Sequence, residues 1–440
     1  MMEHFTEIRT LREALGREGR GEARPQDWRI FWGWTRSADV GIKDSEPANV
    51  YSPLTMTEGL GARVLIQWAD GKVSSLRAER AELEQPGPLL AHARAAAYGD
   101  PDSANFLGAQ EAPPVPLFVA ETADAANGAV EPVAALLAVA REKAALHGFR
   151  NASRSVSATH RRAGVITSRG CDLTAESTGF SYGFWFDGQP GDGWTRREVI
   201  PARIASERLA ESCENAVRLK SNEEGFAGGT LPVLLHPRVA EGFFATYVLG
   251  NFSGERIWNR QSAFRIEQFR ERALVFREDL TVRLEPLVPY GPGSYPFTSE
   301  GVPARRADYI VSGRLAFPIL DLKYARRFGM EPVPPPATIE SLAVESCEEI
   351  PSEKALQEMG RGLLVLGILG LHTQDAASGD FSLSAGQSLA VRGGRLGGRV
   401  RAAISGNFFE ILRSAGLRLV RFPGHHMPGI LMVAPVLVEP

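Results

Sequence analysis

The 440-residue sequence is poor in the residue types that most often hold metals, with 3 cysteines and 8 histidines. Cys171, Cys213 and Cys347 lie far apart and are odd in number, which excludes a disulfide framework and any CxxC zinc module. No two histidines have the i, i+4 spacing that places both imidazoles on one helix face. The three separate thiols favour a reducing compartment, and we expect a cytoplasmic protein.

A dominant charge and a long apolar run are also missing. The formal net charge is −3, and no run of arginines exceeds a pair, so we expect no direct contact with nucleic acid. Six of the 49 basic residues are lysine, a skew typical of GC-rich coding. The longest apolar run, Gly362–Leu371, has about half of the ~20 residues that a membrane span needs. We therefore expect no membrane association.

Motifs for nucleophilic or phosphate chemistry are weak. Residues 179–183 read GFSYG and match GxSxG, but the aromatic residues that follow predict a strand rather than the strand-to-helix turn of a nucleophile elbow. Cys171 is expected to be packed and inert. The glycines of GGRLGG at 393–398 are expected to form a hairpin turn rather than a phosphate cradle.

The pattern of apolar residues predicts an α+β protein with two domains. Residues 1–200 are expected to form a mixed domain of helices and antiparallel strands. Helices are predicted at 3–15, 78–97 and 130–147, and strands at 28–34, 62–68, 117–120, 153–158, 163–168 and 173–186. Residues 201–225 are expected to hold a bridging helix, 201–220, and the start of an exposed linker, 221–230.

Residues 226–440 are expected to form a second domain built on a curved antiparallel sheet or partial barrel. Short strands alternate there with glycines, at 231–235, 308–317, 362–373, 381–391, 400–404 and 430–438. Three helices are predicted between them, at 237–250, 352–359 and 407–415.

A series of phrases in the second half resembles one known family. They are FTSEGVP at 297–303, YIVSGRL at 309–315, DLKYA at 321–325, RGLLV at 361–365, GLHTQDAASGDFS at 370–382 and VRAAISGN at 400–407. In this order they are similar to the TldD/PmbA family, once called modulators of DNA gyrase, over roughly residues 225–440. The first half matches more weakly, through EGLGARVL at 58–65 and TSRG at 167–170.

Several residues of these phrases are candidates for structural or peptide-cavity roles. Glu300 and Gly301 are expected at a turn, and Gly379 and Asp380 at a hairpin turn, where glycine supplies a positive φ. Asn407 is an N-cap candidate. His372, at the end of an apolar strand, completes this set of candidates, which is expected to maintain the fold first.

The resemblance implies two kinds of family member. One is a zinc metallopeptidase with HExxxH on a helix and a cysteine ligand near the C-terminus, and the other lacks these groups and pairs with the first. On the matching helix of this chain, the motif positions hold Thr246, Tyr247 and Asn251, which are degenerate as metal-site positions. The C-terminal stretch FPGHHMP at 422–428 has no cysteine.

The resemblance therefore implies a TldE-like, non-catalytic subunit of a metallopeptidase complex that binds and helps to process or degrade unfolded peptides. Zinc is expected in a TldD-like, HExxxH-bearing partner and no cofactor in this chain, which is not expected to be catalytic alone. An extended peptide would add its backbone to an exposed strand edge. A homodimer is a further expectation, since exposed sheet edges are often covered by a second subunit.

Two other readings stay open. The chain could be a stand-alone or homodimeric peptide-processing or peptide-tailoring enzyme whose metal site is relocated to His372, His425 and His426, with Glu300 or Asp380. Alternatively, it could regulate gyrase or contact DNA, which the near-neutral charge disfavours.

Overall fold

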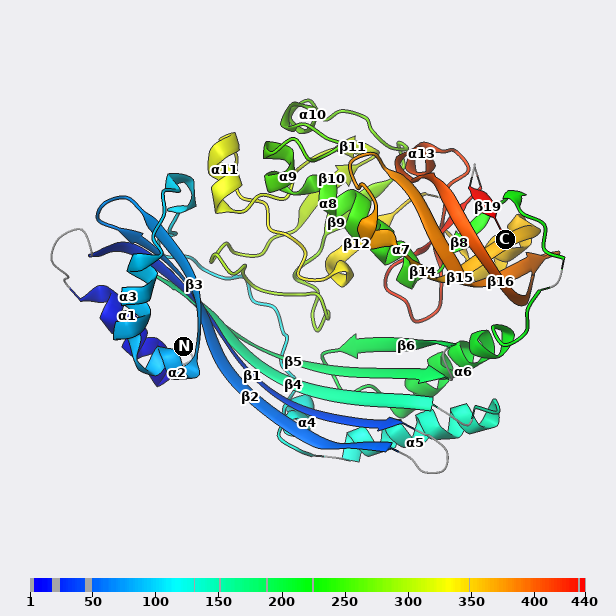
Figure 1. Ribbon diagram of the computed structural model, residues 1–440, viewed down its shortest axis with the longest axis horizontal. Helices are drawn as coiled ribbons and strands as arrows, with labels where there is room; N and C mark the ends of the chain where they lie inside the picture. Colours follow the sequence, from blue (N-terminus) through cyan, green and yellow to red (C-terminus); the bar gives the residue numbers. More distant parts are fainter. Residues whose placement is uncertain are drawn as a thin grey trace.

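The computed structural model describes residues 4–17, 24–43, 50–129, 131–149, 152–186, 189–223, 225–347, 349–433 and 436–439. The first half builds a long curved sheet, and the second half lies over the concave side of this sheet (Figure 1). This arrangement places segments that are far apart in sequence next to each other at the junction of the two halves.

The curved sheet has six antiparallel strands in the order β3-β2-β1-β4-β5-β6. Their bounds are β1 Pro25–Lys43, β2 Val50–Trp68, β3 Val73–Glu79, β4 Ala152–Thr167, β5 Asp172–Phe186 and β6 Gln189–Arg196. Helices cover its convex face (Figure 1): α1 Thr6–Gly16, α2 Arg80–Glu84, α3 Pro86–Ala95, α4 Ala120–Ala126, α5 Glu131–Leu146 and α6 Ala202–Arg218. A short 3-10 helix, η2, spans Pro101–Ser103.

Alternation along the strands explains why the two faces of this sheet differ. In β1, Ile30 and Trp32 are buried against α1, whose Ile8, Leu11 and Leu15 are buried in the same cluster. The intervening positions point to the concave face. Near the start of β1 they are Arg29 and Phe31, and farther along the strand they are small, so that Gly33 pairs with Gly61 and Ser37 with Thr57. The convex face thus carries the apolar cluster with α1, and the concave face is lined by small residues beyond Arg29 and Phe31.

The second half contains two sheets, and they share one large apolar core. The larger has nine strands in the order β13-β17-β18-β8-β14-β15-β16-β19-β7, and the smaller has four in the order β11-β10-β9-β12. Their bounds are β7 Gly229–Thr230, β8 Val233–Leu235, β9 Thr281–Leu284, β10 Ala307–Val311, β11 Arg314–Leu315, β12 Leu342–Glu345, β13 Glu349–Pro351, β14 Arg361–Leu369, β15 Asp380–Arg392, β16 Arg395–Asn407, β17 Arg418–Arg421, β18 Gly429–Met432 and β19 Leu437–Glu439.

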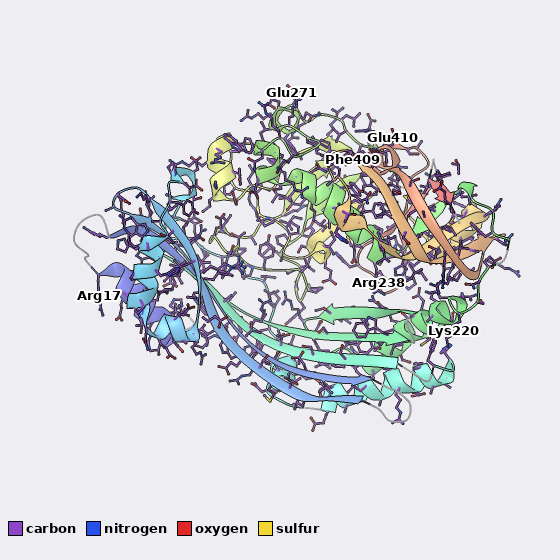
Figure 2. The ribbon with its side chains drawn as sticks, in the orientation of Figure 1. Arg17, Lys220, Arg238, Glu271, Phe409 and Glu410 are labelled. Atoms are coloured by element: carbon purple, nitrogen blue, oxygen red, sulfur yellow. The ribbon has the colours of Figure 1, made fainter. Side chains whose placement is uncertain are left out.

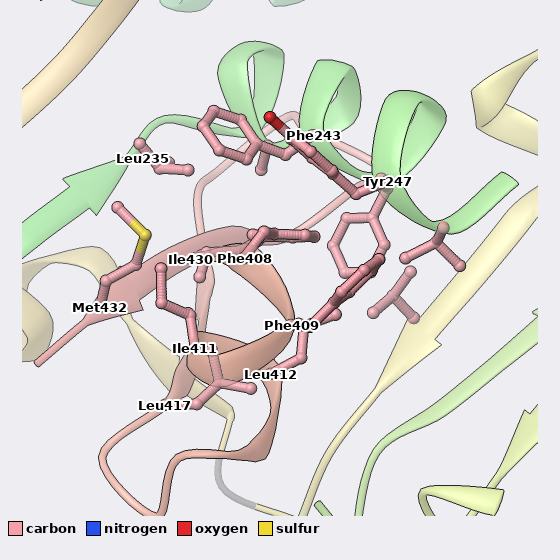
Figure 3. Close-up of a cluster of buried hydrophobic side chains, with 14 of the residues drawn as sticks. Leu235, Phe243, Tyr247, Phe408, Phe409, Ile411, Leu412, Leu417, Ile430 and Met432 are labelled. Carbon is pink, nitrogen blue, oxygen red and sulfur yellow. The ribbon is translucent and has the colours of Figure 1, made fainter. Parts of the chain in front are cut away.

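Short helices connect these strands. They are α7 Pro237–Phe243, the π-helical turn η3 Phe244–Leu249, α8 Gly250–Phe252, α9 Gly254–Trp258, α10 Ile266–Arg270, α11 Leu322–Phe328, η4 Ile339–Ser341, α12 Ser352–Met359, η5 Leu371–Thr373 and α13 Phe408–Arg413. Figure 3 shows the centre of the core, where Phe243 and Tyr247 meet Phe408 and Phe409 of α13. The ring centroids of Phe243 and Phe408 are 5.1 Å apart.

The α+β fold class is confirmed, with corrections in the first half. The predicted strand at 117–120 is wrong: Leu117 is extended but bonds only through its carbonyl, which accepts from Thr178 N at 3.0 Å, and α4 begins at Ala120. The two strands predicted at 153–158 and 163–168 are one strand, β4, because Arg161 and Arg162 stay in register with β1 and β5. The bridging helix is confirmed as α6.

The second half also departs in detail from the expectation. The antiparallel sheet includes two parallel pairs, β8 with β14 and β13 with β17. Helices α9, α10 and α11 were missed, since each has only five to seven residues. The segment after α6 is largely exposed as predicted, yet Glu223 ties it to Arg392 by an ion pair of 2.8 Å. The domain limits at residues 200 and 225 stay a prediction.

Within the described residues, no single helix is both long and apolar enough to cross a membrane. Helices α4 and α5 meet the length and composition only when taken together, and they are bent by 84° relative to each other.

Candidate functional site

The helix that carries the degenerate metal positions begins at a buried histidine. His236 follows β8 and caps α7, accepting a hydrogen bond from Arg238 N at 3.5 Å. Pro237 occupies the first helical position. The helix widens into the π-helical turn η3 before it closes as α8. Such widened turns occur frequently at functional sites.

Tyr247 and Asn251 lie on the buried side of this helix and are committed to backbone groups. The Tyr247 hydroxyl donates to Asp380 O at 2.8 Å, and burial raises the pKa of Tyr247 to about 12. Asn251 Nδ2 donates to Tyr247 O at 2.9 Å and to Ala376 O at 2.7 Å, while its Oδ1 accepts from Ala263 N at 2.7 Å. Thr246 is half-buried.

These three residues do not fit a zinc ion. Both amide hydrogens of Asn251 are used, its oxygen is already an acceptor, and Tyr247 keeps its proton at neutral pH. Across the described residues, no group of three His, Cys, Asp or Glu side chains is placed to hold a metal ion. The helix contributes packing and hydrogen bonds rather than metal ligands.

Gly379, Asp380 and Asn407 form one network beside this helix. Asp380 Oδ1 accepts from Asn407 Nδ2 at 2.8 Å, and Asn407 Oδ1 accepts from Glu410 N at 3.0 Å, so Asn407 caps α13 as predicted. Gly379 has φ +79°, as expected, but it lies where a loop enters β15 and not in a hairpin turn. Through Asp380 O this network also reaches Tyr247.

Glu300 lies at a cavity between the concave face of the curved sheet and the loops of the second half. Its carboxylate is 3.2 Å from Arg29 Nη2 and accepts from Leu322 N at 2.8 Å. Burial raises the pKa of Glu300 even though Arg29 opposes the shift. The cavity of about 320 Å³ is lined by Arg29, Phe31, Arg63, Val64, Leu65, Ser75, Thr298, Ser299, Glu300, Val302, Leu320, Asp321, Pro334 and Pro335.

Gly301 packs closely against Cys171, in the turn between β4 and β5 of the curved sheet, next to this cavity. Its φ of +84° is one that side chains rarely adopt, and a Cβ at this position would be 3.0 Å from Cys171 Sγ. Cys171 is fully buried, as predicted, and burial raises the pKa of its thiol. The turn at Glu300 and Gly301 therefore joins the two halves and aims Glu300 at the cavity.

A second group of ionisable residues, not recognised in the sequence as a set, lies where β6, α6, α7 and the loop after β17 meet. We call Asp192, Arg208, His236, Arg238 and His425 the junction cluster. The Asp192 carboxylate is 2.7 Å from Arg208 Nε and 3.5 Å from Arg238 Nη1, and the rings of His236 and His425 stand perpendicular at 4.7 Å. Figure 2 shows Arg238 on the side of the second half that faces the curved sheet.

The junction cluster keeps its histidines neutral. Burial, with the nearby arginines, lowers the pKa of His425 to about 4 and that of His236 well below its usual value. Near the cluster, burial raises the pKa of Glu241 to about 7. The sequence drew attention to the adjacent histidines at 425 and 426 but could not predict the cluster itself, because Asp192 and Arg208 lie more than 200 residues away from them.

The alternative metal site is not assembled. His425 belongs to the junction cluster, whereas the His426 ring contacts Leu342 O at 3.0 Å. His372 lies exposed in η5. The three histidines therefore do not combine into a group that holds a metal among the described residues.

Comparison with known proteins agrees with the arrangement of the second half. Residues 228–432 match the family model described as the PmbA/TldA metallopeptidase C-terminal domain. Residues 228–432 thus form a domain of the PmbA/TldD type. A curated relative, an uncharacterised protein of Methanocaldococcus jannaschii, is 23% identical over 270 residues, which are 57% of this chain and 60% of the relative.

Solved structures extend the PmbA/TldD likeness to the fold of nearly the whole chain. A protein described as a candidate modulator of a DNA gyrase, from Thermotoga maritima, has a TM-score of 0.76 at 21% identity and covers 94% of this chain and 95% of its own. TldE from Thermococcus kodakarensis has a TM-score of 0.76 at 18% identity, covering 94% and 97%. At these identities the likeness establishes the fold alone.

Proposed function

We propose that this chain is the non-catalytic, TldE-like subunit of a metallopeptidase complex, and that a TldD-like partner supplies the HExxxH motif and the zinc. The observation that carries the proposal is the helix of Tyr247 and Asn251, whose polar atoms are bonded to backbone groups. A family built around a metallopeptidase domain would then use this chain for a role other than holding the metal.

The proposed role is to receive an unfolded peptide and help to process or degrade it. Among the described residues, strand β6 pairs with β5 alone, and it lies at the edge of the curved sheet beneath the second half (Figure 1). An extended peptide could add its backbone to such an edge, a mode that depends little on side chains. The cavity beside Glu300 offers a place for one peptide side chain, because its walls combine Arg29 with Phe31 and Leu65.

We place this activity in the cytoplasm, and the three cysteines, none of which forms a disulfide in the described part of the chain, support that location. His372 is proposed to face the peptide path, since it is exposed in η5, the turn that follows β14.

The test is co-expression with a family member that bears HExxxH, followed by purification through a tag on this chain. We expect a stable complex that contains zinc and cleaves an unstructured peptide, while this chain alone contains none and cleaves nothing. A partner variant with the motif glutamate replaced by glutamine is expected to assemble but not to cleave. Stoichiometric zinc and peptide cleavage by this chain alone would overturn the proposal.

A further inference from the structure

A cavity of about 730 Å³ opens on the second half of the molecule, between the short helices α9, α10 and α11. Figure 1 shows α9 and α10 on the side away from the curved sheet and α11 beside the end of that sheet, next to η2. Figure 2 labels Glu271, which follows α10. The charged residues that line it are four arginines and one acid: Arg260, Arg265, Arg270, Arg327 and Glu267. We call this cavity the arginine groove.

The charge of the arginine groove is not balanced from within the described part of the chain. Arg260 and Arg265 form no ion pair there, and neither does Glu267. Arg327 Nε is 2.8 Å from Asp102 Oδ2, and Arg270 Nη2 donates to Phe328 O at 2.8 Å, which leaves further N–H groups on both guanidinium groups. Four guanidinium groups that share one cavity repel one another, so a bound anion would be stabilised.

The remaining walls of the groove are apolar and aromatic. Trp258 is 45% exposed, and its ring lies 5.4 Å from that of Phe328. The Arg327 guanidinium lies 4.9 Å from the centroid of Trp258, which fixes its direction by a cation–π contact. Ile257, Phe264 and Ile266 complete the apolar lining. A volume of this size is in the range of small-molecule sites.

We propose that the arginine groove binds a small molecule with two linked phosphoryl groups, either inorganic pyrophosphate or a nucleoside diphosphate. Arginine cannot lose its proton, and its planar fork matches phosphate oxygens in pairs. The guanidinium groups of Arg260 and Arg265 form no ion pair among the described residues, so each is available to bind one phosphoryl group. The groove shares no lining residue with the cavity beside Glu300, and its arginines do not belong to the helix of Tyr247, so the proposal does not depend on the proposed peptidase role.

The experiment is isothermal titration of the full-length chain with pyrophosphate and, separately, with ADP. We expect saturable binding that weakens as salt rises, and Arg260→Gln and Arg265→Gln are each expected to weaken it at least tenfold. Glu267→Gln removes the single negative charge and is expected to tighten binding severalfold. Arg395→Gln, at the exposed first residue of β16, is the matched control and is expected to change nothing. Tighter binding of ADP than of pyrophosphate identifies the nucleoside form.

Thermal unfolding without ligand shows whether each variant is folded. The proposal is overturned if neither probe binds, or if the folded Arg260 and Arg265 variants bind as tightly as the parent chain. Equal binding of citrate, which carries carboxylates instead of phosphoryl groups, would also overturn it, as would binding of single-stranded DNA in the absence of pyrophosphate binding.

Discussion

Tyr247 donates a hydrogen bond of 2.8 Å to the backbone oxygen of Asp380, the residue that begins β15. One side chain thereby joins the helix of the degenerate motif to the sheet it covers. Asp380 in turn accepts from Asn407, which caps α13. The three positions that the sequence offered as separate candidates are thus parts of one structural network.

Removing the Tyr247 hydroxyl tests this network. Tyr247→Phe keeps the ring but leaves Asp380 O without this partner in a partly buried place, so we expect the free energy of unfolding to fall by about 1 kcal/mol. Urea denaturation measures the change. Tyr290→Phe is the control, since Tyr290 is 42% exposed and its hydroxyl has no protein partner among the described residues. An equal loss in both variants would contradict the assignment.

Asn251 is expected to be more sensitive, because its side chain satisfies three backbone groups. Asn251→Ala removes the partners of Ala376 O and Ala263 N together, and we expect a loss of about 2–4 kcal/mol in the free energy of unfolding. The same substitution at exposed Asn259 is expected to cost less than about 0.5 kcal/mol. Zinc uptake by the parent chain that Asn251→Ala abolished would instead show that this residue is a ligand.

Glu241 is expected to make the folded state less stable as the pH rises. Its pKa is about 7 in the folded chain and near 4.5 when unfolded, so the folded state binds more protons between these values. Its contribution therefore favours folding below pH 4.5 and is lost as the pH rises through 7. Glu241→Gln is expected to raise the free energy of unfolding at pH 8 by about 3 kcal/mol and to have little effect at pH 4.5. Exposed Glu84→Gln serves as the control, and a gain that does not depend on pH would refute the assignment.

His425 is expected to have the opposite effect, so that the folded state becomes less stable as the pH falls. Its pKa falls to about 4 in the folded chain from 6.5 unfolded, so the unfolded state binds more protons between these values. Stability from this group is complete above pH 6.5 and falls as the pH drops through 6.5 towards 4. Replacing His425 with Asn is expected to reduce the difference in unfolding free energy between pH 7.5 and 4.5 by about 2 kcal/mol. His92→Asn, on the exposed face of α3, is expected to leave that difference unchanged.

Comparing Gly301→Ala with Gly329→Ala separates the cost of a positive φ from the cost of a steric contact with Cys171. Gly301 and Gly329 both have a positive φ, but a Cβ at Gly329 meets open space, whereas at Gly301 it meets Cys171 Sγ at 3.0 Å. We expect Gly329→Ala to cost about 1 kcal/mol and Gly301→Ala about 1–3 kcal/mol more. Adding Cys171→Ala to Gly301→Ala is expected to recover part of the difference. Equal costs at the two glycines would show that the contact with Cys171 is relaxed.

The local pattern of apolar and end residues in the sequence was enough to predict those helices and turns whose formation depends on neighbouring residues. The helix at 352–359 was predicted with the bounds that the structure shows, and α6 with nearly the same bounds, because apolar spacing and end residues act within a few turns. The cap at Asn407 and the hairpin turn at Gly393 and Gly394 follow from the same short-range chemistry. The ordered phrases of the second half were enough to predict the family.

Only the tertiary structure decided which distant residues meet. Asp192 lies 5% exposed beside Arg208, His236 and His425 because β6, α6, α7 and the loop after β17 converge, and no spacing in the chain encodes that approach. The same convergence of α9, α10 and α11 gathers Arg260, Arg265 and Arg327. Strand pairing also merged two predicted strands into β4, since hydrogen bonds to β1 and β5 outweigh the local polarity of Arg161 and Arg162. Burial then set the pKa values, because desolvation depends on what surrounds a group rather than on its neighbours in sequence.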